Sequence, residues 1–170
     1  MAQSAPIQDR FVLVVKHQIK AISTMIDNAN DAGLTEKTSD DVDLILNIID
    51  AMEKNNKQSE LVEMFIAKSE FWDIIVNKDI KALEKDFPKM FDKLPVNKDT
   101  LSEPIRIYLA EKGKLATKKV PVIGDKHMDA MWVNLDKLVK ASCIYDFENG
   151  SKLKDKHNLG KYYTKYSIGN

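Results

Sequence analysis

Histidine, cysteine and serine, the residue types that most often carry chemistry, are scattered along this chain without the spacing that catalysis needs. The histidines His17, His127 and His157 are far apart, and the metal-binding spacings His-x-x-x-His, Glu-x-x-His and Cys-x-x-Cys do not occur. The Gly-x-Ser-x-Gly motif of serine hydrolases and the glycine-rich loop that holds nucleotide phosphates are also missing. We therefore predict no catalytic residue, no metal ligand and no cofactor, and we expect a non-enzyme. A site assembled from residues distant in sequence stays open as an alternative.

The single cysteine, Cys143, lies among apolar neighbours near the C-terminal end of a predicted helix. A nucleophilic thiol needs a helix N-terminus or a basic neighbour, so we expect a buried structural thiol instead. One cysteine cannot form an intramolecular disulfide, and residues 1–10 lack the basic and then apolar pattern of a secretory signal. These features predict a cytoplasmic location.

Charge is balanced overall but is unevenly distributed along the sequence. Lys and Arg number 26, as do Asp and Glu, and only Arg10 and Arg106 are arginines. Few arginines disfavour sequence-specific DNA reading, which relies on the bidentate guanidinium. Residues 27–60 contain nine acidic residues and only three lysines, whereas residues 151–170 contain five lysines and one aspartate. These two segments are therefore the candidate interaction surfaces.

The basic segment interleaves lysines with tyrosines. This pattern suits single-stranded nucleic acid, because lysines follow phosphates while rings stack on bases. The alternatives are a tail docked on its own domain or on another copy, and a solvated tail. The candidate nucleic-acid or partner contacts are Lys152, Lys154, Lys156, Lys161, Tyr162, Tyr163, Lys165, Tyr166, Lys118 and Lys119. The candidate acidic partner surface is Asp40, Asp41 and Asp43.

Apolar residues at three- and four-residue steps predict the elements that position these surfaces. We predict helices over about 7–29, 40–52, 59–66, 71–76, 80–87, 103–112 and 125–148, with Ser39 and Asp125 as caps. The run 71–76 also suits a buried strand, and 89–92 is expected to be at most a turn. The fold class is all-α: a compact bundle of about five to seven helices over residues 1–150, with a long C-terminal helix. Residues 151–170 form a Lys/Tyr-rich tail, docked or mobile.

No apolar run approaches the roughly 20 residues that a spanning helix needs, so we expect no membrane insertion. Without catalytic motifs but with many apolar stripes, the chain is predicted to be a non-enzymatic protein-interaction or structural module. Its partner is another protein or a second copy. The alternative is a nucleic-acid-binding accessory protein that uses the Lys/Tyr tail.

One stretch supports a family resemblance. The segment Phe71-Trp72-Asp73-Ile74-Ile75-Val76-Asn77-Lys78-Asp79-Ile80, together with Met131-Trp132, Leu135 and Leu138 on the last helix, resembles small uncharacterised helical proteins of large cytoplasmic DNA viruses of protists and algae. The resemblance covers the middle and last helices and implies no catalytic residue. It implies a viral assembly or virion component, located in the host cytoplasm or the particle.

Overall fold

The computed structural model of the chain describes residues 5–112 and 121–169. The prediction of an all-α protein is confirmed, since the described residues form helices and no strand. None of these helices is both long and apolar enough to cross a bilayer. The helices, with 3₁₀ helices marked η, are α1 (Ile7–Asp31), α2 (Asp40–Lys54), α3 (Gln58–Ile66), η1 (Ser69–Phe71), α4 (Trp72–Val76), α5 (Ile80–Asp86), η2 (Phe87–Phe91), η3 (Asp99–Ser102), α6 (Glu103–Lys112), α7 (Asp125–Glu148) and α8 (Gly160–Lys165).

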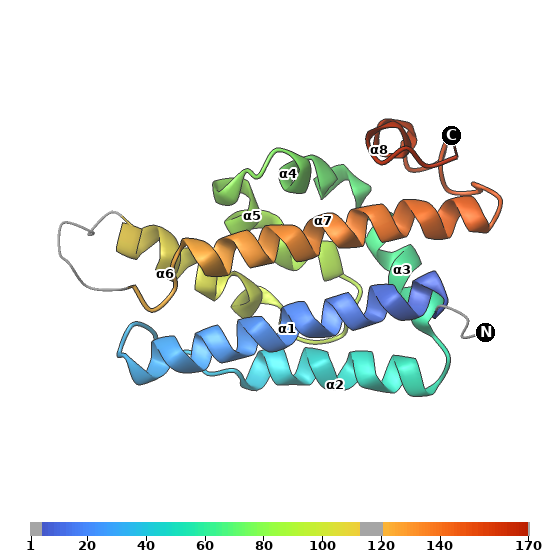
Figure 1. The fold of residues 1–170 in the computed structure, drawn as a ribbon. Helices are drawn as coiled ribbons and strands as arrows, with labels where there is room; N and C mark the ends of the chain where they lie inside the picture. Colours follow the sequence, from blue (N-terminus) through green and yellow to red (C-terminus); the bar gives the residue numbers. More distant parts are fainter. Residues whose placement is uncertain (1–4, 113–120, 170) are drawn as a thin grey trace.

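The two longest helices organise the molecule (Figure 1). Helix α1 lies between α7 and α2 and contacts both, and these three run side by side. The shorter elements α3, α4, α5 and η2 pack behind them, while α8 lies over the end of α7. At 1.5 Å per residue, α7 with its 24 residues is roughly 36 Å long and spans the whole body.

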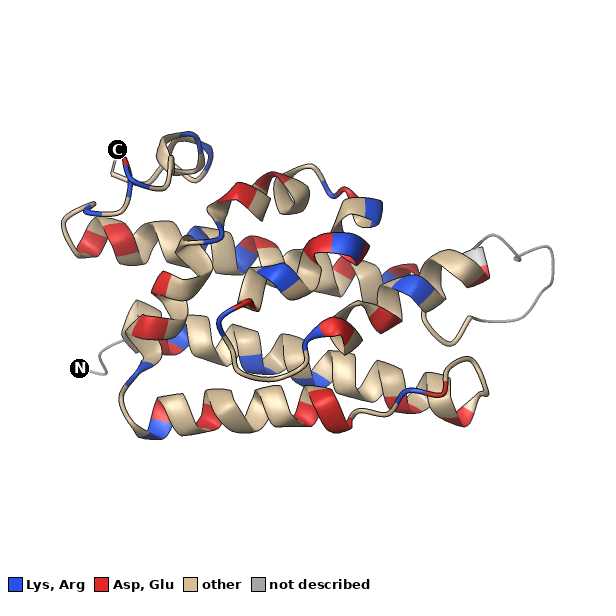
Figure 2. Ribbon diagram, turned by 180° about the vertical axis from the view of Figure 1, so that it is seen from behind, with Lys and Arg blue, Asp and Glu red and all other residues tan. Residues whose placement is uncertain are grey.

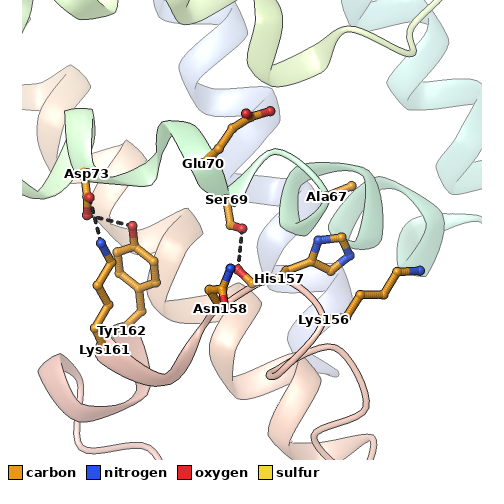
Figure 3. Close-up of a pocket in the computed structure, with 9 residues that line it drawn as sticks. All are labelled: Ala67, Ser69, Glu70, Asp73, Lys156, His157, Asn158, Lys161 and Tyr162. Atoms are coloured by element: carbon orange, nitrogen blue, oxygen red, sulfur yellow. Dashed lines mark hydrogen bonds and ion pairs between the residues drawn. The ribbon is translucent and has the colours of Figure 1, made fainter.

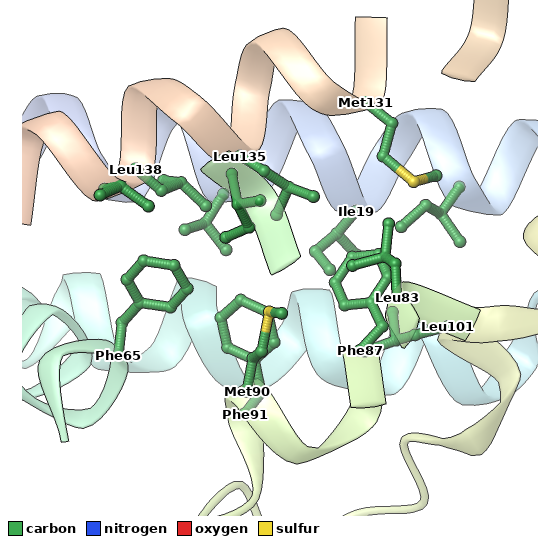
Figure 4. Packing of buried hydrophobic residues seen from close by; sticks show 14 of the residues in the cluster. Ile19, Phe65, Leu83, Phe87, Met90, Phe91, Leu101, Met131, Leu135 and Leu138 are labelled. Carbon is green, nitrogen blue, oxygen red and sulfur yellow. The ribbon is translucent and has the colours of Figure 1, made fainter. Parts of the chain in front are cut away.

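We call α1, α2 and α7 the first layer and the shorter elements behind them the second layer. The core lies between the two layers (Figure 4). One stripe of α1, which includes Phe11 and Ile19, is fully buried and faces side chains from the second layer. Phe65 is central to the second layer, because its ring centroid lies 5.6 Å from that of Phe11, 5.5 Å from that of Trp72 and 5.9 Å from that of Phe91. Aromatic contacts of this kind add to the hydrophobic stabilisation of the core.

The segment after Pro88 contributes more to the core than its sequence suggests. We expected at most a turn over 89–92, but residues 87–91 form the 3₁₀ helix η2. Pro88 has no N–H and therefore cannot continue the hydrogen-bond ladder of α5. In the tighter helix that follows, residues three apart lie on one side. Phe87 and Met90 are consequently buried on one side, and Phe91 is buried against Phe65.

Two helix starts differ from the predicted caps. The Ser39 side chain makes no capping bond to the backbone, and its hydroxyl donates to the Asp43 carboxylate at 3.3 Å. At the start of α7 the N-cap position belongs to Gly124, and Asp125 is the first helical residue. The Asp125 carboxylate accepts a hydrogen bond from the Tyr108 hydroxyl at 2.5 Å, which ties α7 to α6.

Candidate functional site

The C-terminal segment, residues 151–169, folds back over the end of α7 and lies against α4 (Figure 1). Gly150, with φ of +89°, ends α7 in a backbone conformation that favours glycine. The backbone N–H of Leu153 then donates to the Asp146 carboxylate at 2.9 Å. Leu159, Tyr162 and Tyr163 are buried and belong to the same core as the helices.

Each tyrosine of the segment donates its hydroxyl to a carboxylate on an earlier helix. Burial is the main cause that raises the pKa of all three tyrosines, and the neighbouring carboxylate raises each further. The hydroxyls therefore stay protonated and can donate throughout the neutral range. The pairs are Tyr162 with Asp73 at 2.8 Å, Tyr163 with Asp146 at 2.8 Å, and Tyr166 with Asp136.

The rings of Tyr162 and Tyr163 are buried in the protein, and that of Tyr166 is half-buried. The Trp72 ring packs edge-on against Tyr162, with centroids 5.0 Å apart. Lysine ammonium groups lie over all three rings, at 5.2 Å from the Tyr162 centroid, 4.9 Å from Tyr163 and 5.6 Å from Tyr166. Two of the three predicted stacking rings, Tyr162 and Tyr163, are thus buried, and they hold the segment in place.

The lysines lie on the outside of the folded segment. We call Lys152, Lys154, Lys156, Lys161 and Lys165 the C-terminal basic surface; all but Lys154 are exposed, and Lys154 is half-buried. Lys161 forms an ion pair with Asp73 at 2.7 Å, and this contact, followed by the Tyr162 hydroxyl, lowers the Asp73 pKa. The other predicted basic contacts, Lys118 and Lys119, lie outside the described residues.

A cleft of about 380 Å³ separates the C-terminal segment from η1 and α4 (Figure 3). The Ser69 hydroxyl donates to the backbone carbonyl of His157 at 2.8 Å and bridges its two walls. Burial, followed by the nearby Lys156 ammonium, lowers the His157 pKa. Figure 3 shows the imidazole near Ala67, with Ser69 between it and Asp73. These groups do not converge on one point where a substrate atom would react.

Cys143 is buried inside α7. Burial, followed by the charge of Asp146, raises its pKa to about 12. A thiol with such a pKa is almost fully protonated at neutral pH and is a poor nucleophile.

The three aspartates of the predicted acidic surface do not act as one group. The Asp41 carboxylate accepts hydrogen bonds from Asn97 and Thr100, both at 3.1 Å, and so ties α2 to η3. Asp43 accepts from Ser23 of α1 at 2.9 Å. Asp40 is exposed at the start of α2. Two of the three carboxylates thus hold helices together.

The predicted acidic surface at the start of α2 and the C-terminal basic surface lie far apart in the molecule. The start of α2 lies at the lower left of Figure 1, while α8 lies at the upper right. Figure 2 shows acidic residues repeated along α2 and basic residues on the C-terminal segment. The C-terminal segment docks on its own helices, but its carboxylate partners come from α4 and α7 and not from residues 27–60.

The residues that our sequence reasoning missed are these carboxylates, Asp73, Asp136 and Asp146. They are distant from the tyrosines in sequence, and their types are common on helix surfaces. Asp146 is only 1% exposed, so it is a buried acid within the helix stripe. Its position near the end of α7, one turn before Gly150, is the only signal that could have marked it.

No cluster of three or more His, Cys, Asp or Glu side chains suited to a metal ion occurs in the described ranges. Searches against protein-family models, curated proteins and solved structures find no match to this chain.

Proposed function

We propose that the protein is a non-enzymatic helical interaction module that contacts an acidic partner protein through its C-terminal basic surface. One observation carries the proposal: tyrosine hydroxyls bonded to carboxylates of α4 and α7 hold the lysine-bearing segment against the body. The lysines are therefore presented on a folded support.

A folded support changes what the lysines contribute to binding. A flexible tail loses conformational freedom when it binds, and this loss reduces affinity. Here the ordering cost of the backbone is met during folding, as Tyr162 and Tyr163 are buried in the core. Charges on a fixed surface also favour partners of complementary shape and charge, and they speed the encounter. Following the resemblance to helical viral proteins, we propose that the setting is viral assembly or the virion.

The test is capture of partners from native lysate with two charge-reversed variants. Lys152→Glu with Lys156→Glu reverses two exposed lysines of the C-terminal basic surface. Lys81→Glu with Lys93→Glu makes the same charge change at exposed positions elsewhere. We expect partners that resist nuclease to be lost from the first variant and retained by the second. Equal capture by both variants would contradict the proposal.

The second candidate is a nucleic-acid accessory protein, and it is favoured by the same exposed lysines. Because the rings of Tyr162 and Tyr163 are buried, such binding uses mainly the phosphates and little base stacking. It therefore weakens steeply with salt and shows no base preference. Fluorescence anisotropy with thymine and adenine oligonucleotides over a salt series tests this. If the captured partners disappear on nuclease treatment and the protein binds both oligonucleotides in a salt-dependent way, this second function replaces the first proposal.

A further inference from the structure

A second surface, on the other side of the molecule from α4 and α5, is formed by α1 and α7 (Figure 1). The two helices run antiparallel, and Asn134 Nδ2 donates to Gln18 Oε1 at 3.0 Å near their midpoints. A groove of about 250 Å³ lies between them, lined on both sides by alanine and methionine. These residues are Ala21, Met25, Ala130 and Met131. We call this surface the α1/α7 face.

Two apolar side chains project from this face into solvent. Leu13 of α1 is 54% exposed and Val133 of α7 is 53% exposed. Scattered exposed leucines are common in proteins. Here they belong to the two helices that form a groove with an apolar lining, and methionines adapt their shape to what packs on them.

Charge is segregated along the same face. The hydrogen bond between Gln18 and Asn134 sets the register, so the start of α1 lies beside the second half of α7. That end carries three exposed cations together with Glu148, whereas the other end carries three exposed carboxylates together with Lys126, and the exposed Lys20 lies between the two ends. The cations are Arg10, Lys137 and Lys140, and the carboxylates are Asp27, Asp31 and Asp129.

We propose that the α1/α7 face binds a second copy of the chain across a two-fold axis. In such an interface the same patch meets itself, turned by half a revolution. When this axis lies in the interface and runs across the helices, the basic end of each copy faces the acidic end of the other. Leu13 lies at the basic end, while the groove residues Met25 and His127 lie toward the acidic end. The rotation that pairs the charges therefore also brings Leu13 of each copy toward the groove of the other.

The size of the face suits this role. Helices of about 36 Å in length and about 10 Å in diameter, lying side by side, present roughly 700 Å². Specific protein interfaces bury about 800 Å² per partner. The paired surface thus has the area of a small, reversible dimer. This proposal is independent of the C-terminal basic surface, since its test uses purified full-length protein alone.

The first test is sedimentation velocity of the purified chain over a concentration series. We expect a concentration-dependent dimer that Leu13→Glu abolishes. Leu44→Glu is the matched control, because Leu44 is 49% exposed on α2 and lies outside the face. Circular dichroism confirms that both variants fold. A chain that stays monomeric, or a dimer that survives Leu13→Glu, would overturn the proposal.

The second test uses the charges. Lys137→Glu with Lys140→Glu makes both ends of the face acidic, and Asp27→Lys with Asp129→Lys makes both ends basic. Each variant alone is expected to be monomeric because like charges meet. An equimolar mixture is expected to recover a heterodimer that high salt weakens. A mixture that stays monomeric refutes the two-fold arrangement.

Discussion

Replacing Tyr163 by Phe removes one hydroxyl and leaves the ring that fills the core. In the native protein this hydroxyl donates to Asp146 at 2.8 Å and lies 3.2 Å from the Ser151 hydroxyl. Asp146 is 1% exposed, so water does not replace the lost donor. The variant keeps one bond to the carboxylate, from the Leu153 N–H at 2.9 Å. The substitution therefore isolates one buried charge-assisted hydrogen bond.

The expected cost follows from that geometry. A hydrogen bond to a charged group contributes about 1.5–3 kcal/mol, and the loss is largest when the partner stays buried. We expect the free energy of unfolding to fall by about 2 kcal/mol, which lowers Tm by roughly 4–8 °C in a chain of this size. Asp146→Asn tests the same bond from the other side, and the double variant should show a coupling of about 1 kcal/mol or more.

The assay is urea unfolding followed by tryptophan fluorescence and circular dichroism. Tyr145→Phe is the control on the same stretch of α7, because the Tyr145 hydroxyl donates at 3.1 Å to Glu63, which is exposed. That variant should lose less than about 1 kcal/mol, as surface interactions contribute little. A Tyr163→Phe cost no larger than that of Tyr145→Phe would show that the tyrosine–carboxylate bond does not hold the segment.

Two further predictions concern pH and the core. The folded-state pKa values of Tyr162, Tyr163 and Tyr166 are raised above the unfolded value of about 10, so the stability they provide is complete below that pH. This stabilisation is lost as the pH rises above about 10. The free energy of unfolding should therefore be lower at pH 11 than at pH 8, and the difference should be smaller in Tyr163→Phe than in the native protein. Phe87→Ala should cost about 3–5 kcal/mol, because Phe87 is fully buried. Thermal unfolding measures this loss of stability. If Phe87→Ala lowers the free energy of unfolding by less than about 1 kcal/mol, η2 is not part of the core.

Helix positions were predictable where one physical pattern decides them. The stripes of α1 and α2 follow the helical period over many residues, and the structure has these helices at Ile7–Asp31 and Asp40–Lys54. The run at 71–76 was ambiguous by composition and is the short helix α4, Trp72–Val76. The element η2 was missed because five residues with a proline carry too little periodicity. Its burial is decided by Phe65 and other distant contacts.

The candidate site was only partly predictable. The composition of residues 151–170 identified the lysines, and those in the described range lie at the surface or half-buried. The burial of the tyrosines was not predictable, because it depends on where α4 and α7 place Asp73, Asp136 and Asp146. No local rule connects residues that lie up to 89 positions apart, as Tyr162 and Asp73 do.

The tyrosines explain how one sequence pattern fits two different roles. A tyrosine has an apolar ring and a polar tip, so it can stack on a base or pack in a core with its hydroxyl bonded. The choice depends on whether an acceptor is available inside the fold. In this chain Asp73, Asp136 and Asp146 provide three acceptors, and the rings are used for folding. The lysines between them cannot be buried without a large desolvation cost. Folding therefore separates the pattern into an internal tyrosine anchor and an external basic surface, and it is the external part that a partner meets.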